Sequence, residues 1–157
     1  MMYSIYPSAV KRTFFCVVSV LILAGTAVAS GQRIGITAEK ANMRSGPGTQ
    51  YDQLWQAERY YPLIVIEKKG KWYKVKDFEA DIAWVHESLV GNISSVITNI
   101  SKGSCNVRSK GSKDGRIIFT VERGVPFRVL ERKKGSRWIK IKHGDGNVGW
   151  IHDSLVW

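Results

Sequence analysis

A tryptophan followed by two lysines at alternate positions is the first pattern in this sequence that could bind a ligand. The segment Trp72-Tyr73-Lys74-Val75-Lys76 alternates, and successive side chains of a β-strand point to opposite faces, so Trp72, Lys74 and Lys76 share one face. That face must be solvated, because burying an unpaired ammonium group costs a large free energy. A partly exposed indole ring beside positive charge suits sugar rings, nucleobases or acidic peptides. Alternatively, the ring only covers one end of the fold.

The same alternation returns later in the chain, beside a cluster of positive charge. Trp138, Lys140 and Lys142 share one face of a second predicted strand. Four basic residues precede it at the tip of a predicted hairpin: Arg132, Lys133, Lys134 and Arg137. Residues 91–157 hold 13 Lys and Arg against 5 Asp and Glu (13 − 5 = +8), whereas residues 31–90 hold 9 against 8 (+1). The later segment therefore attracts polyanions, or its charge only keeps the protein soluble.

Two arginines, Arg44 and Arg108, each follow an Asn and an apolar residue. A guanidinium group at such a position can clamp a carboxylate of an acidic ligand. It can also hold a loop in place by donating hydrogen bonds to backbone carbonyls. We favour the second interpretation, because shared folding requirements explain why both parts of the chain keep the arginine.

The histidines and cysteines do not form a pattern typical of a metal site or a catalytic centre. His86, His143 and His152 lack the spacing of zinc ligands. Cys105 has no base partner near it in the sequence, so we interpret it as a small buried residue rather than a reactive thiol. The sequence has no Gly-x-Ser-x-Gly elbow and no glycine-rich phosphate loop. It therefore predicts a protein that is not an enzyme and uses no metal or cofactor.

The first 29 residues have the features of a secretory signal peptide. Lys11 and Arg12 precede an apolar run at 13–24, and Ala27-Val28-Ala29 is a small-residue cleavage site. The alternative is an uncleaved anchor, because the uncharged stretch of about 17 residues is just long enough to span a bilayer. We expect cleavage after Ala29, a periplasmic or extracellular location, and no stable membrane span after cleavage.

The rest of the chain contains one pattern twice. Residues 41–45 (Ala-Asn-Met-Arg-Ser) recur as residues 105–109 (Cys-Asn-Val-Arg-Ser), at an offset of 64. Beyond a glycine turn the offset becomes 66, so that Trp72 matches Trp138. This change places a two-residue insertion within 134–137. Such units are too few and too long for most solenoids, which predicts two tandem domains.

We place these domains at residues 30–91 and 96–157, behind the signal peptide at 1–29. The whole chain has 157 residues, of which 44% are hydrophobic, so it can build two small cores but not a barrel enzyme. Short β-rich runs with a period of two predict strands. They lie at 63–66, 72–76, 83–85, 127–130, 138–142 and 149–151. Helix is limited to single turns at 87–89 and 153–155, so each unit is predicted to be a small bent barrel.

Three motifs of the first unit resemble those of the bacterial Src-homology-3 (SH3b) domain. They are Asn-Met-Arg-Ser-Gly-Pro-Gly-Thr at 42–49, Gly-Lys-Trp-Tyr-Lys-Val at 70–75 and Ala-Trp-Val at 83–85. The second unit matches at 106–108, 135–141 and 149–151. The resemblance spans nearly all of the chain after the signal peptide. It implies an all-β fold of two tandem SH3-like barrels preceded by a signal helix.

The resemblance also implies a protein that binds or targets. Domains of this family often accompany cell-wall hydrolases and are thought to dock on peptidoglycan or its peptides. We expect a cell-wall polymer or an envelope protein as the partner, with the Trp–Lys faces and the basic hairpin tip as ligand-binding residues. The alternative is a polyanion binder that holds nucleic acid or an acidic membrane surface through the second unit, with a steep salt dependence. Specific recognition of nucleic acid is not expected.

Overall fold

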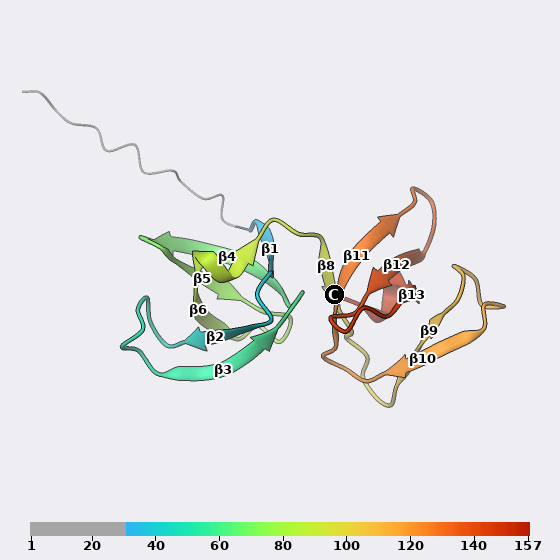
Figure 1. Ribbon diagram of the computed structural model, residues 1–157, viewed down its shortest axis with the longest axis horizontal. Helices are drawn as coiled ribbons and strands as arrows, with labels where there is room; N and C mark the ends of the chain where they lie inside the picture. The colour runs from blue at the N-terminus through green and yellow to red at the C-terminus, as the bar shows by residue number, and fades with distance from the viewer. Residues whose placement is uncertain (1–30) are drawn as a thin grey trace, which may run out of the picture.

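The computed structural model describes residues 31–157, and the predicted signal peptide and its helix lie outside the described residues. The described chain is all-β apart from two single-turn 3₁₀ helices, as predicted. Its strands form two separate antiparallel sheets, one in each of the two repeated units, which are called modules from here on (Figure 1). Within residues 31–157, no helix is long and apolar enough to cross a membrane.

The first module is a bent seven-stranded sheet in the order β3-β2-β6-β5-β4-β1-β7. The short helix η1 (Glu87–Leu89) connects its last two strands in sequence. Its strands are β1 (Arg33–Ile36), β2 (Lys40–Arg44), β3 (Gln53–Glu58), β4 (Pro62–Lys69), β5 (Trp72–Lys76), β6 (Ile82–His86) and β7 (Val90–Gly91).

The second module repeats this order with six strands, β10-β9-β13-β12-β11-β8. The helix η2 (Asp153–Leu155) follows its last strand, as η1 follows β6. Its strands are β8 (Ser95–Ile97), β9 (Cys105–Arg108), β10 (Ile117–Val121), β11 (Pro126–Arg132), β12 (Trp138–Lys142) and β13 (Val148–His152). Each strand therefore has a counterpart in the first module, which is the duplication that the sequence offsets indicated.

Glycines and histidines fix the local turns. Gly70 and Gly135 have φ angles of 58° and 81° in the turns between the two long strands of each module, a conformation that residues with a side chain rarely adopt. His86 and His152 are the N-caps of the 3₁₀ helices, and each Nδ1 accepts a hydrogen bond from the backbone N–H two residues later. The single turns predicted at 87–89 and 153–155 are thus confirmed as η1 and η2.

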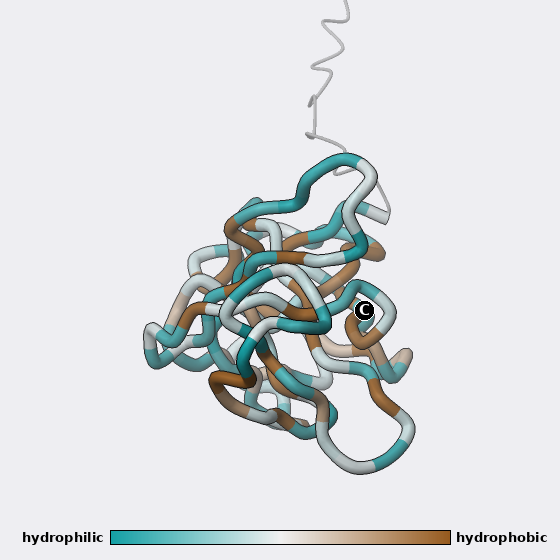
Figure 2. The backbone as a smooth tube through the Cα atoms, turned by 90° about the vertical axis from the view of Figure 1, so that its right-hand side faces the viewer, coloured by the Kyte–Doolittle hydropathy of each residue, from teal (hydrophilic) through white to brown (hydrophobic). Residues whose placement is uncertain are grey.

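Each module has its own hydrophobic core. Hydrophobic and hydrophilic stretches follow one another along the backbone (Figure 2), and the inward-facing hydrophobic residues of each sheet are buried. Val75 and Val85 are fully buried in the first core, and Phe127 and Ile141 in the second. Cys105 is buried in the second core, as expected, and this burial raises the pKa of its thiol. The two cores share no residue, which supports two independently packed barrels.

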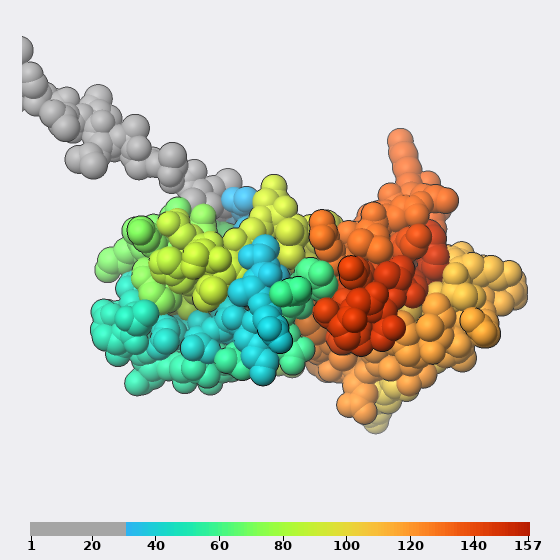
Figure 3. Space-filling model, in the orientation of Figure 1, coloured from blue at the N-terminus to red at the C-terminus, as the bar shows by residue number. Residues whose placement is uncertain are grey.

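The two modules lie side by side, and several side chains meet between them. Figure 3 shows the C-terminal segment, in red, beside the blue and cyan strands of the first module. The guanidinium of Arg33 lies 4.2 Å from the centre of the Trp157 ring, a cation–π contact across the junction. Arg123 of the second module also pairs with Glu79 of the first at 3.1 Å. The junction is therefore held by stacking and charge as well as by the chain itself.

Candidate ligand-binding grooves

Each module carries a groove of the same construction on its outer face. The two grooves have volumes of about 500 and 550 Å³. Eight lining positions are equivalent under the offsets of 64 and 66. In the first groove they are Lys40, Asn42, Arg44, Thr49, Trp72, His86, Ser88 and Leu89, and in the second Ser104, Asn106, Arg108, Lys113, Trp138, His152, Ser154 and Leu155. The duplication therefore preserves a surface cavity as well as the cores.

A tryptophan and a histidine form the centre of each groove. Trp72 is paired with His86 across β5 and β6, and Trp138 with His152 across β12 and β13. The rings meet edge to face, with centroids 5.2 Å apart in the first pair and 5.5 Å in the second. Both tryptophans are partly exposed, as predicted. Each groove thus presents part of an aromatic ring to solvent.

A serine holds the imidazole in this arrangement. The distance from Nδ1 of His86 to Oγ of Ser88 is 2.8 Å, and from His152 to Ser154 it is 2.7 Å. Capping of the 3₁₀ helix and packing on the tryptophan therefore account for both histidines. Among residues 31–157 no group of three or more His, Cys, Asp or Glu side chains is placed to hold a metal ion.

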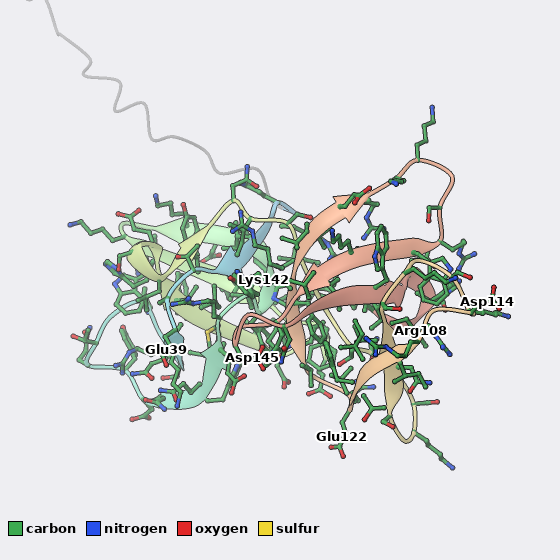
Figure 4. The ribbon with its side chains drawn as sticks, turned by 45° about the vertical axis from the view of Figure 1, so that its right-hand side comes forward. Glu39, Arg108, Asp114, Glu122, Lys142 and Asp145 are labelled. Carbon is green, nitrogen blue, oxygen red and sulfur yellow. The ribbon has the colours of Figure 1, made fainter. Side chains whose placement is uncertain are left out.

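Arg44 and Arg108 hold the loop that forms one wall of each groove. Nη1 of Arg44 donates to the backbone carbonyls of Thr49 at 3.2 Å and Tyr51 at 2.8 Å. Nη1 of Arg108 donates to the carbonyl of Gly115 at 2.8 Å. Figure 4 shows Arg108 at the base of this loop and Asp114 toward its outer end. The loop-holding interpretation is confirmed, and the arginines shape the groove through the loop.

Trp84 and Trp150, which follow the alternation of β6 and β13, lie on the outer face and outside both cores. Trp84 is nevertheless only 8% exposed. In the second module, a Cβ added to Gly111 would come within 3.1 Å of both the Trp150 ring and the Cβ of Trp138. The loop after β9 therefore packs directly on Trp138 and Trp150, and Gly111 permits the close approach.

The predicted Trp–Lys faces extend beyond the grooves, which include the tryptophan of each face but not its lysines. Trp72 and Trp138 line the grooves, but Lys74, Lys76, Lys140 and Lys142 do not. Nζ of Lys74 lies 5.9 Å from the centre of the Trp84 ring, one step along the strand from the groove. The second lysine of each strand is four residues from the tryptophan, or about 13 Å at the rise of a β-strand. Figure 4 places Lys142 toward the boundary of the modules, well away from Arg108.

The predicted basic hairpin tip is a separate surface. Arg132 ends β11, and Lys133, Lys134 and Arg137 lie between β11 and β12; all four are exposed. Lys133 pairs with Glu131 at 3.3 Å, and Nε of Arg137 pairs with Asp153 at 2.8 Å. None of the four lines a groove, and two of them, Arg132 and Arg137, line a different cavity at the junction of the modules.

Single sequence motifs did not identify four polar residues that line the grooves: Asn42, Asn106, Ser88 and Ser154. Their side chains add amide and hydroxyl groups, which can donate and accept hydrogen bonds. The signal was present in the sequence, since all four recur at the offsets of the repeat. A ring with neighbouring amide and hydroxyl groups can stack on one face of a ligand and hydrogen-bond to its edge.

Comparisons with known proteins agree with the fold. Two family models, each described as a bacterial SH3 domain, match residues 39–91 and 101–157. The chain is 28% identical over 138 residues to "Putative N-acetylmuramoyl-L-alanine amidase YrvJ" of Bacillus subtilis (strain 168). The match covers 78% of this chain and 26% of that protein, so the chain spans about a quarter of its length.

Two solved structures from Trichomonas vaginalis are also similar over much of the chain. NlpC1 has a TM-score of 0.36 at 13% identity, covering 88% of this chain and 49% of that one. NlpC2 has a TM-score of 0.35 at 12% identity, with coverages of 82% and 48%. At such scores these likenesses say nothing about function. The two family matches, together with the two sheets of matching strand order, show that the chain belongs to the bacterial SH3 domain family and carries two such domains in tandem.

Proposed function

We propose that this protein is an exported, non-catalytic binding protein whose two grooves recognise the peptidoglycan of the cell wall or its peptides. The observation that carries this proposal is the duplicated groove. Eight equivalent positions line the grooves, and each groove contains a partly exposed tryptophan packed against a histidine. A core residue can recur because the fold needs it. A solvent-facing cavity with the same ring, amide and hydroxyl groups recurs more readily when it binds a ligand.

The chemistry of the grooves suits a glycan or a short peptide. The apolar face of a sugar ring, or a peptide bond, can stack on the indole of Trp72 or Trp138. Asn42 or Asn106 can then hydrogen-bond to hydroxyl or amide groups along the edge of the ligand. The grooves differ in where their lysine lies, because Lys40 and Thr49 of the first correspond to Ser104 and Lys113 of the second. Each groove therefore offers one lysine to a carboxylate of the ligand, at a different position on its wall.

The relative from Bacillus subtilis supports a cell-wall ligand. Its name describes an amidase that acts on N-acetylmuramoyl-L-alanine, a bond of peptidoglycan, and about a quarter of it matches this chain. The segment that matches this chain would then serve to hold the wall. The N-terminal segment supports export, and the mature protein is expected to begin at Ser30.

The non-catalytic part of the proposal rests on Cys105. It is the sole thiol among residues 31–157, it is buried, and burial raises its pKa. A thiol acts as a nucleophile in its thiolate form, which this environment disfavours. Incubation of the protein with purified peptidoglycan should therefore release no new amino or reducing groups. Release that persists in purified protein and is lost in Cys105→Ser would contradict this part.

A sedimentation assay with washed cell wall tests the binding. The mature protein should pellet with the wall at moderate salt, and its tryptophan fluorescence should change on binding. The double variant Trp72→Ala/Trp138→Ala should lose most of the bound fraction, and each single variant should lose part of it.

The matched control is Leu54→Ala/Ile118→Ala. These two side chains are also equivalent, are 50% and 45% exposed, and line neither groove. The control should pellet like the wild-type protein. The proposal is wrong if the wild-type protein stays in the supernatant. The grooves are the wrong site if both double variants bind equally well.

A further inference from the structure

A second kind of cavity lies at the junction of the modules, with a volume of about 500 Å³. Arg33 of the first module lines it together with residues of the second. Its charged side chains are those of Arg33, Arg132, Arg137 and Asp153, and their charges sum to 3 − 1 = +2. A surface that gathers three guanidinium groups from both modules has a strong preference for anions.

The equivalent residues of the first module show how Arg132 comes to lack an acidic partner among the described residues. There, Nζ of Lys68 pairs with Glu87 at 2.7 Å, and this hydrogen bond lowers the pKa of the Glu87 carboxyl. In the second module Arg132 stands in place of Lys68 and Asp153 in place of Glu87. Asp153 pairs with Nε of Arg137 instead, at 2.8 Å. Among residues 31–157 no acidic group pairs with Arg132.

Arg33 is positioned by an aromatic ring that the first module lacks. Its guanidinium lies 4.2 Å from the centre of the Trp157 ring, whereas the equivalent of Trp157 in the first module is Gly91. A guanidinium group stacked on a ring keeps its N–H groups free around its edge, where they can bind an oxyanion. Arg33 has no ion pair within the described part of the chain. The ring therefore holds the guanidinium of Arg33, which has no ion pair among the described residues, at a cavity that Arg132 also lines.

We propose that this junction cavity is a binding site for a phosphate group, with Arg33 and Arg132 as its main ligands. A phosphate monoester carries a charge of about −1.5 to −2 near neutral pH, opposite in sign to the summed charge of the side chains that line the cavity. Its oxygens can accept paired hydrogen bonds from the planar forks of two arginines. Arg137 keeps its bond to Asp153 and contributes its remaining N–H groups.

This cavity shares Ser154 with the second groove, but none of its arginines lines either groove. It also differs from an anion site on the second module alone, since one of its two main ligands comes from the first module. The inference therefore does not rest on the proposed function, and the two can fail separately.

Calorimetric titration of the full mature protein with inorganic pyrophosphate, at low salt, tests the site. We expect one pyrophosphate per chain. Arg132→Ala should weaken binding about tenfold, because a charge-assisted pair of hydrogen bonds is lost. Arg33→Ala should weaken it by a similar factor. Since Arg33→Ala also removes the contact with Trp157, Arg132→Ala is the cleaner variant.

Two comparisons distinguish a built site from general attraction. Arg116→Ala removes the same charge from an exposed side chain that does not line the cavity, and it should bind pyrophosphate within twofold of the wild-type protein. Arg132→Lys keeps the charge but loses the planar fork, and should bind more weakly than the wild-type protein. Equal losses in Arg116→Ala and Arg132→Ala would overturn the site. An unchanged affinity in Arg33→Ala would exclude the junction, and citrate binding as tightly as pyrophosphate would refute the choice of phosphate.

Discussion

Replacing Arg108 by alanine separates the two roles that an arginine beside a groove can have. Nη1 of Arg108 donates to the carbonyl of Gly115 at 2.8 Å in a partly buried position, closing the loop between β9 and β10. A hydrogen bond from a charged group contributes about 1.5–3 kcal/mol, so we expect a loss of about 2 kcal/mol in the free energy of unfolding of the second module. For a module of about 60 residues, each kcal/mol shifts Tm by about 4–8 °C, so the Tm should fall by about 8–16 °C.

Differential scanning calorimetry of the full mature protein measures this shift. The transition of the second module should move to lower temperature while that of the first stays in place, because the cores are separate. Hydrogen exchange reports on the loop itself. The amide of Ser109 donates to the carbonyl of Arg116 at 2.9 Å across the loop, and its exchange should accelerate in Arg108→Ala.

The variant Arg108→Lys is the matched control for charge. It keeps the positive charge but has no planar fork to reach the carbonyl, so most of the loss should remain. The loop-holding role would be refuted if Arg108→Ala left both the Tm and the exchange of Ser109 unchanged. A loss of wall binding in such a fully stable variant would instead assign the arginine to the ligand.

Three further predictions concern packing and titration. Phe127→Ala should cost about 3–5 kcal/mol, because this fully buried ring fills the second core, and calorimetry should show only the second transition moving down. Gly35→Ala should destabilise the junction, since the added Cβ would come within 2.7 Å of both a carbon of Ile93 and Oγ of Ser95, and a lower Tm with faster exchange at the junction would show it. Because burial raises the pKa of Cys105, the unfolded chain loses this proton first, so the thiol should lower stability as the pH rises above about 8.5, the ordinary thiol value. Urea unfolding across this range should show a smaller pH dependence in Cys105→Ala.

The repeat and the alternation of side chains were enough to predict the fold. The period of two placed Val75 and Ile141 in the cores, and the glycines at 70 and 135 marked the turns. These features are local, or they recur at a constant offset, so a single sequence contains the information needed to predict the fold. The loop-holding role of Arg44 could also be predicted, because it satisfies backbone groups within seven residues of it.

The grooves were harder to predict, because they depend on contacts between distant strands. Alternation shows that Trp72 and Lys76 share a face, but not that the groove covers one end of that face. The wall opposite Trp72 comes from Asn42 on β2, thirty residues earlier, which is brought near by the pairing of β2 with β6. Arg33 and Arg132 line the same cavity only because of the way the two folded modules pack together, and no periodic pattern in the sequence encodes that packing.

The link between the modules has a consequence for long ligands. Only residues 92–94 separate β7 from β8, so the two grooves cannot move far apart. If the grooves bind a polymer as proposed, their fixed separation selects ligands by the spacing of the repeating units. Fragments too short to bridge the grooves engage one at a time, whereas longer ones gain from the high effective concentration of the second groove. Affinity should therefore rise in a step at one fragment length rather than gradually with each added unit.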